Sequence, residues 1–202
     1  MCIHFIGRHI NRAPANRIFT TRDFLSYGSR RAVDQALFRM VRSGWIVRVA
    51  RGVFVKQGTK LPSVLEIASA KAKAFGKQIT RHCADLASDL VLTARGTTEL
   101  TFATSGCTSS FLAGDTRVQM KHIGPRKTVL GDTKAGRAIR ALWHLGQAAC
   151  TAYHVSTAHR SFSRTDYEEF RRSAAWMPAW MTRLFEVRPV YPDPALWDPR
   201  QC

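Results

Sequence analysis

The sequence predicts an α+β fold, with an N-terminal winged helix-turn-helix followed by a mixed α/β domain of short strands and helices. Amphipathic helical patterns and β-rich runs follow one another closely within the first 60 residues. Further helices and strands then continue in mixed order. Hydrophobic residues make up 45% of the 202 residues, which is enough for a packed core and argues against wholesale disorder.

The N-terminal elements can be followed in order. Apolar residues at helical spacing predict a short helix over 3–11, and a short extended segment follows at 18–19. Thr20 or Thr21 can cap a further short helix, which Gly28 stops.

The next segment contains the strongest helical pattern. Ser29 can cap a helix over 30–42, in which apolar side chains recur on one face. Two β-rich runs at 45–49 and 52–55 then predict a hairpin with a basic turn. The order of helix, helix, turn, helix and hairpin is typical of a winged helix.

Composition suggests the domain boundaries. The polar, glycine-containing stretch 56–60 separates a winged helix over 1–58 from a second domain over 61–187. A proline-rich tail over 188–202 is expected to be extended and poorly ordered. The second domain should contain helices over 63–75, 81–90, 133–146, 166–173 and 176–185, and strands over 99–103, 108–112 and 117–122.

Charge points to a polyanionic partner. The formal net charge is +17, and the sequence pI of about 10.7 exceeds the value of roughly 9 above which nucleic-acid binding is suspected. Residues 1–60 carry 12 basic and 2 acidic residues, whereas 61–202 carry 19 and 12. The near absence of acids in the first segment suits DNA. A generally basic protein without such a partner is the alternative, because charge bears on association and not on fold.

The candidate DNA contacts gather on the helix over 30–42 and on the hairpin after it. Arg30, Arg31 and Gln35 lie on the outer face of its first two turns, where a recognition helix meets base edges in the major groove. Arg39 and Arg42 are placed to reach phosphates. The full set of candidates is Arg22, Ser29, Arg30, Arg31, Gln35, Arg39, Arg42, Arg48 and Arg51.

Two other interpretations of these residues are open. Arginine-rich helix faces are often simply solvated, and Asp34 can pair with Arg30 or Arg31 on the same helix. Winged helices also serve as protein-docking modules that make no contact with DNA.

Catalytic and metal-binding motifs are not recognisable, so we expect neither an enzyme nor a metal or cofactor site. The seven histidines form no H-E-x-x-H or H-x-E motif, and residues 124–128 lack Walker spacing and are interpreted as a basic turn before a strand. The five cysteines are widely spaced, as in a reducing cytoplasm. No apolar stretch resembles a signal peptide or a membrane span, so we expect a cytoplasmic protein that does not bind membranes.

Three blocks of the N-terminal part carry a family resemblance: FTTRDFL at 19–25, GSRRAVDQAL at 28–37 and RVARGVF at 48–54. They resemble the AbiEi-like antitoxin family of type IV toxin–antitoxin systems. The resemblance is closest over 17–56 and extends more loosely through 76–146 and the block at 177–181. The chain departs from the family directly after the hairpin, where the family has an aromatic residue and a proline.

The resemblance implies a winged helix that binds promoter DNA and represses its operon, and a C-terminal domain associated with neutralising a nucleotidyltransferase-like toxin. Carried over by position, the DNA contacts fall on Arg30, Arg31, Gln35, Arg39, Arg48 and Arg51. We therefore expect a transcriptional repressor that binds an operator in double-stranded DNA and serves as the antitoxin of a toxin–antitoxin system.

Other functions are also open. The first is a protein-interaction module that neutralises or scaffolds a partner without sequence-specific DNA binding. The second is a regulator that has no toxin. A general binder of RNA or single strands is disfavoured by the winged-helix order and by the scarcity of interleaved surface aromatics.

Overall fold

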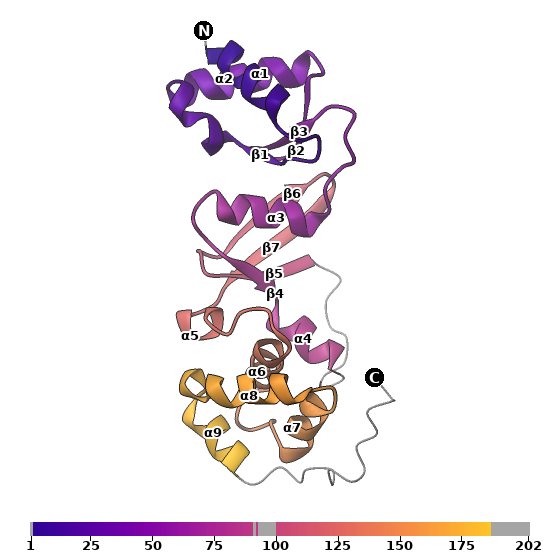
Figure 1. Ribbon diagram of the computed structural model, residues 1–202, viewed down its shortest axis with the longest axis vertical. Coiled ribbons are helices and arrows are strands. Elements are labelled where there is room, and N and C mark those ends of the chain that lie inside the picture. Colours follow the sequence, from indigo (N-terminus) through magenta and orange to yellow (C-terminus); the bar gives the residue numbers. More distant parts are fainter. Residues whose placement is uncertain (1, 91, 93–99, 187–202) are drawn as a thin grey trace. The chain divides into compact units, whose positions relative to one another are not determined.

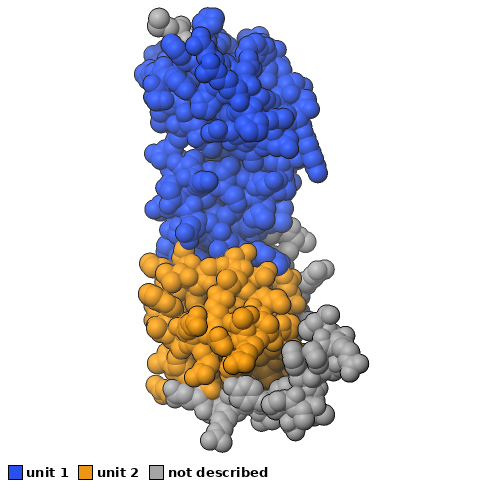
Figure 2. All heavy atoms as spheres, in the orientation of Figure 1, with its two compact units in different colours: residues 1–81, 97–124 blue, residues 82–96, 125–202 orange. Residues whose placement is uncertain are grey.

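The computed structural model describes residues 2–90, 92 and 100–186 of the 202-residue chain. Helices and strands occur in mixed order (Figure 1), which confirms the expected α+β class. The chain divides into two compact units (Figure 2), of which the first comprises 1–81 and 97–124 and the second 82–96 and 125–202. Across the described ranges, no helix has the length and apolar character needed to cross a membrane.

The first six elements have the order of a winged helix-turn-helix. They are α1 (Cys2–Arg12), β1 (Phe19–Thr20), the 3-10 helix η1 (Thr21–Tyr27), α2 (Arg30–Arg42), β2 (Ile46–Ala50) and β3 (Val53–Lys56). The three strands are neighbours in one sheet, in the order β1-β3-β2. The order predicted from the sequence is therefore present, with a 3-10 helix as the second helix.

Helix α2 is fixed at both ends and along one face. The Ser29 hydroxyl accepts a hydrogen bond from the Ala32 N–H at 3.3 Å, as predicted for its N-cap. Beyond the last turn, Gly44 has a φ of 72°, a left-handed conformation that glycine reaches without strain. The buried side chains of α2 pack against α1, η1 and the sheet, and they are Val33, Ala36, Leu37 and Met40. The opposite face of α2 is left to solvent.

The hairpin of β2 and β3 is buried on both faces. Ile46 and Phe54 pack into the cluster that contains α1 and α2. Val53 and Val55 point the other way, into a second cluster that contains residues of α3 (Val64–Lys73). A strand covered on both faces needs apolar residues at successive positions, which explains the uninterrupted apolar run of β3.

Four further strands continue the same sheet. They are β4 (Ile79–Arg81), β5 (Leu100–Thr104), β6 (Ser109–Ala113) and β7 (Thr116–His122), and the strand order is β1-β3-β2-β6-β7-β5-β4. Strands β5 and β7 are parallel, whereas β4 with β5 and β6 with β7 are antiparallel. The junction with the hairpin is narrow: Ala50 pairs with Ala113, and the Gly114 N–H donates to the Val49 carbonyl at 3.1 Å.

The two units do not divide at the expected boundary between residues 58 and 61. Helix α3 and strands β4 to β7 belong to the same unit as the winged helix. The outer face of the hairpin is apolar and needs a cover, which Ile67 and Ala68 of α3 help to provide. The expected proline-rich tail over 188–202 lies outside the described residues.

The described residues of the second unit form helices and connecting turns, and no strands. Its elements are α4 (Cys83–Asp89), α5 (Pro125–Thr128), α6 (Lys134–Leu145), α7 (Ala152–His159), α8 (Arg164–Arg172), the 3-10 helix η2 (Ser173–Trp176) and α9 (Ala179–Glu186). The predicted Thr133 cap of α6 is present, with its hydroxyl accepting from the Gly136 N–H at 3.1 Å. Of the stretch 61–187, the strands and α3 lie in the first unit and the other helices in the second.

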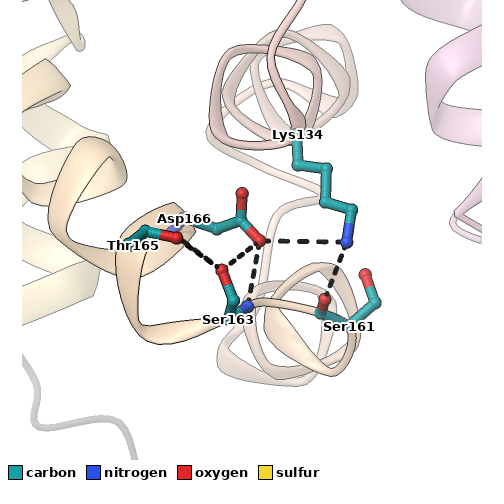
Figure 3. A network of polar contacts seen from close by, with 5 residues as sticks. All are labelled: Lys134, Ser161, Ser163, Thr165 and Asp166. Carbon is teal, nitrogen blue, oxygen red and sulfur yellow. Dashed lines mark hydrogen bonds and ion pairs between the residues drawn. The ribbon is translucent and has the colours of Figure 1, made fainter. Parts of the chain in front are cut away.

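Polar contacts at the start of α8 link it to α6 (Figure 3). The Ser163 hydroxyl accepts from the Asp166 N–H at 3.2 Å, and the Asp166 carboxylate accepts from the Ser163 N–H at 2.9 Å, which makes a capping box. Lys134 of α6 lies 3.8 Å from the same carboxylate and donates to the Ser161 carbonyl at 3.5 Å. This network fixes the start of α8 at Arg164, two residues earlier than the sequence pattern predicts.

Candidate nucleic-acid interface

The outer face of α2 carries most of the residues predicted to contact DNA. Arg31, Gln35, Phe38 and Arg42 recur at spacings of four, three and four residues, so they form one line along the helix, which we call the α2 stripe. The stripe lies opposite the buried face of the helix. The predicted contacts on α2 and its cap are all exposed, and they are Ser29, Arg30, Arg31, Gln35, Arg39 and Arg42.

Arg30 and Asp34 form an ion pair beside the α2 stripe. The Nε atom of Arg30 lies 2.9 Å from the Asp34 carboxylate, and both side chains are more than half exposed. The sequence leaves open whether Asp34 pairs with Arg30 or Arg31, and the structure places it on Arg30. An exposed pair of this kind adds little to stability. Its effect is to offset one positive charge at the beginning of α2.

Two shallow depressions follow one another along α2, and Gln35 and Phe38 line both. The first is completed by Arg30, Arg31 and Asp34, and the second by Arg39, Arg42 and Ser43. The Phe38 ring is 62% exposed, and the Arg42 guanidinium carbon lies 6.0 Å from its centroid. The sequence pattern places Phe38 outside the core but gives it no role.

Arg48 and Arg51 of the hairpin are both exposed, and hydrogen bonds hold its turn in place. Arg51 lies in the turn between β2 and β3. The Gly52 carbonyl accepts a hydrogen bond from the Thr21 N–H at 3.1 Å. The Arg51 carbonyl accepts one from the Lys71 ammonium at 3.0 Å. The hairpin is therefore no free-standing wing, although its arginine side chains still reach solvent.

Lys71 is a basic residue of this region that the sequence pattern does not reveal. It lies on α3, 20 residues from Arg51, and its ammonium is 5.3 Å from the centroid of the Phe111 ring. Burial lowers the pKa of Lys71 below its ordinary value, and the charges of Arg51 and Arg48 lower it further. The lysine therefore joins the two arginines in one group of like charges, which we call the hairpin cluster. Finding it requires knowing that α3 packs on the hairpin.

Arg22, like Arg30, has a side chain that is bound within the first unit. Its guanidinium donates to the Ala74 carbonyl at 3.0 Å and lies 4.4 Å from the centroid of the Phe75 ring. Arg22 thus ties the start of η1 to the end of α3. Its neighbour Thr21 is hydrogen-bonded to Gly52, the residue after Arg51, so Arg22 lies on the side of the hairpin cluster.

Across the described ranges, no group of three or more His, Cys, Asp or Glu side chains gathers as a metal site would require.

The comparison with known families concerns most of the chain. Residues 6–169 match DUF6088, a family of unknown function. The match reaches from α1 through the hairpin and the sheet into α8, whereas no curated protein matches the chain. The family description names no activity and does not link the chain to AbiEi-like antitoxins. Because the match covers well over half of its residues, the chain belongs to the DUF6088 family.

Proposed function

We propose that this protein binds double-stranded DNA through its winged helix and acts as a cytoplasmic transcriptional repressor at an operator. The observation that carries the proposal is the α2 stripe. The stripe is an exposed, basic face of α2, the helix that follows the turn of the helix-turn-helix. Ser29 caps this helix, and its single acid, Asp34, offsets one of its positive charges. Such a face complements both the phosphates and the base edges of a major groove.

Within this proposal the residues divide into readers of bases and contacts to phosphates. Arg31 and Gln35 lie in the first two turns, where Arg can bind guanine and Gln can bind adenine through two hydrogen bonds each. Arg39 and Arg42 lie further along α2 and would contact phosphates. The hairpin cluster would contact the phosphates of the DNA backbone beside the groove. Arg30 and Ser29 would meet the phosphate nearest the helix start, where the backbone N–H groups favour an anion.

The second unit supports a second candidate function, which is docking of a protein partner. Tyr153 and Trp176 are exposed large aromatic side chains, and Val129 is an exposed apolar one. Exposed aromatic residues are enriched at protein interfaces and their hot spots. Together with the AbiEi-like resemblance, they favour an antitoxin whose second unit neutralises a nucleotidyltransferase-like toxin. The same residues would serve a module that scaffolds a partner without sequence-specific DNA binding.

Selection from a random duplex pool, followed by titrations, tests the DNA-binding proposal. The protein should enrich a defined sequence, and the affinity for the selected and a scrambled duplex should be compared at one salt concentration. We expect Arg31→Ala and Gln35→Ala each to weaken binding to the selected duplex by roughly 1–3 kcal/mol and to the scrambled duplex by less. Arg160→Ala removes an exposed arginine of the second unit and serves as the matched control. Equal losses on both duplexes would refute base reading, and the absence of any enrichment would refute the proposal.

Co-purification with the product of a neighbouring gene tests the second candidate. We expect a nucleotidyltransferase-like protein to be retained by the wild type and by Arg31→Ala, and lost from the double variant Tyr153→Ala, Trp176→Ala. Retention by the double variant would exclude these side chains as the docking surface. The absence of such a neighbour would leave the repressor without a toxin.

A further inference from the structure

Phe38 lies at the centre of the α2 stripe. At about 100° per residue, its direction around the helix axis is within roughly 20° of Arg31 and 40° of Arg42. Val33 and Met40, which are buried, lie on the opposite side of the helix. The ring is therefore placed where the helix is farthest from its own core.

A single exposed aromatic residue is common on protein surfaces, so the exposure of Phe38 alone would carry no function. Its surroundings distinguish it. Phe38 and Gln35 together line both depressions along α2, and the Arg42 guanidinium lies beside the ring. Folding does not require an apolar ring here, because the buried face of α2 is already complete without it.

The charges around Phe38 favour DNA as the occupant of this surface. Both depressions are bordered by arginines, which complement a phosphate backbone. Arginine and aromatic residues also occur together at protein–protein interfaces, and it is the excess of four arginines over one acid along α2 that favours a polyanion. A partner that fits this surface must offer phosphates to the arginines and an apolar group to the Phe38 ring. The major groove offers one such group, the C5 methyl of thymine.

We infer that Phe38 is a specificity-determining residue that packs against the C5 methyl group of a thymine in the major groove. The inference rests on the proposed function, because it requires α2 to lie in that groove. Gln35 lies three residues earlier on the same stripe and suits adenine. The α2 stripe would accordingly read adenine and thymine in neighbouring base pairs, with the arginines of α2 holding the phosphates around them.

Replacement of thymine by deoxyuridine tests this directly, because it removes only the C5 methyl group. Each thymine of the selected duplex is replaced in turn, and affinities are measured for the wild type, Phe38→Ala and Phe38→Leu. At one position we expect the wild type to bind about fourfold more weakly, the effect of losing one buried methyl group. Phe38→Ala should be insensitive to the same replacement, whereas Phe38→Leu should keep part of the effect. Leu61→Ala, which removes an equally exposed apolar side chain outside α2 and the hairpin, should behave as the wild type.

The outcomes separate this inference from the proposed function. If the wild type enriches no duplex, the proposed function fails and the inference with it. If a duplex is enriched but Phe38→Ala leaves every thymine effect unchanged, only the inference is wrong. Dissociation of a wild-type oligomer by Phe38→Ala at unchanged DNA affinity would make the ring a protein contact and also overturn it. The thermal unfolding midpoint of Phe38→Ala should match that of the wild type. If it is lower, the thymine replacements are compared between the wild type and Phe38→Leu.

Discussion

Asp34 accepts a charge-assisted hydrogen bond from Arg30 one turn before it, with 2.9 Å between the Arg30 Nε and the carboxylate. Asp34 is the single acid in the sequence of α2. Because the pair is exposed, its contribution to folding is small. Its larger consequence is electrostatic, since it lowers the positive potential of the surface that we propose for DNA. A weaker general attraction raises the share of binding that depends on base contacts.

Asp34→Asn should therefore strengthen binding to every duplex by a few-fold at low salt, and by less as the salt concentration rises. The ratio of affinities for the selected and scrambled duplexes should fall. Fluorescence anisotropy titrations across a salt series measure both quantities. Glu168→Gln is the matched control, because Glu168 pairs with Arg164 at the same spacing on α8 of the second unit. A loss confined to the selected duplex would instead mean that Asp34 itself reads a base.

The hairpin cluster should contribute equally to the binding of all DNA sequences. We expect Arg51→Ala and Lys71→Gln to weaken binding to selected and scrambled duplexes equally, and each to reduce the slope of log K against log salt by about 1. Arg160→Gln, which removes an exposed arginine of the second unit, should leave the slope unchanged. If the slope falls for Arg22→Gln and stays unchanged for Lys71→Gln, the contact with the DNA backbone lies at the start of η1 and not at the hairpin.

The sequence predicts α2 and its exposed face well because the signals are local. Ser29 caps the helix, the apolar spacing defines its buried side, and both act within a few turns of chain. No local signal of this kind predicts that Lys71 belongs to the hairpin cluster. Its membership depends on α3 packing against β2 and β3, which follows from long-range burial and not from any pattern near Lys71. The same packing explains why the polar stretch at 56–60 is no boundary between units.

Two helices of the second unit escape the sequence patterns for identifiable reasons. Helix α7 has a capping box in which His154 Nδ1 accepts from the Thr151 N–H at 3.2 Å, where a carboxylate is the usual partner. Helix α5 begins at Pro125, a residue that suits the first turn of a helix but that also marks turns. The interpretation of 124–128 as a turn before a strand is wrong for that reason.

Gly136→Ala should destabilise the second unit. A Cβ at this position would collide with the carbonyl group of Leu130, which belongs to the backbone and cannot rotate away. We expect a loss of about 1–3 kcal/mol in the free energy of unfolding, typical of overpacking, despite the higher helix propensity of alanine. Gly124→Ala is the control, because no atom lies within 4 Å of the Cβ that it adds. Chemical denaturation followed by circular dichroism gives both values, and equal stability of the two variants would show that the loop at Leu130 yields freely.

His159 makes the stability of the second unit depend on pH. Its ring lies among aromatic side chains, with centroids 4.3 Å from Phe170 and 4.8 Å from Phe162. Its Nε2 atom is buried and has no hydrogen-bond partner among the described residues. Burial lowers the pKa of His159 from 6.5 to about 4, because the charged ring would lose its hydration without a compensating contact.

Between pH 6.5 and about 4, the unfolded chain therefore binds a proton at His159 that the folded chain does not. The stabilisation from neutral His159 should be complete above pH 6.5 and should diminish as the pH falls toward 4. Thermal unfolding at pH 7.5, 6.5, 5.5 and 4.5 should show a falling midpoint, and His159→Phe should flatten that fall because phenylalanine does not titrate. His4→Gln, which removes an exposed histidine of the first unit, should leave the fall intact. The carboxylates of Glu66 and Asp166, whose pKa values are lowered by their capping contacts with Ser63 and Ser163, act only at lower pH. An unchanged pH dependence in His159→Phe would therefore assign the effect to another group and show that the cage of aromatic rings admits water to the imidazole.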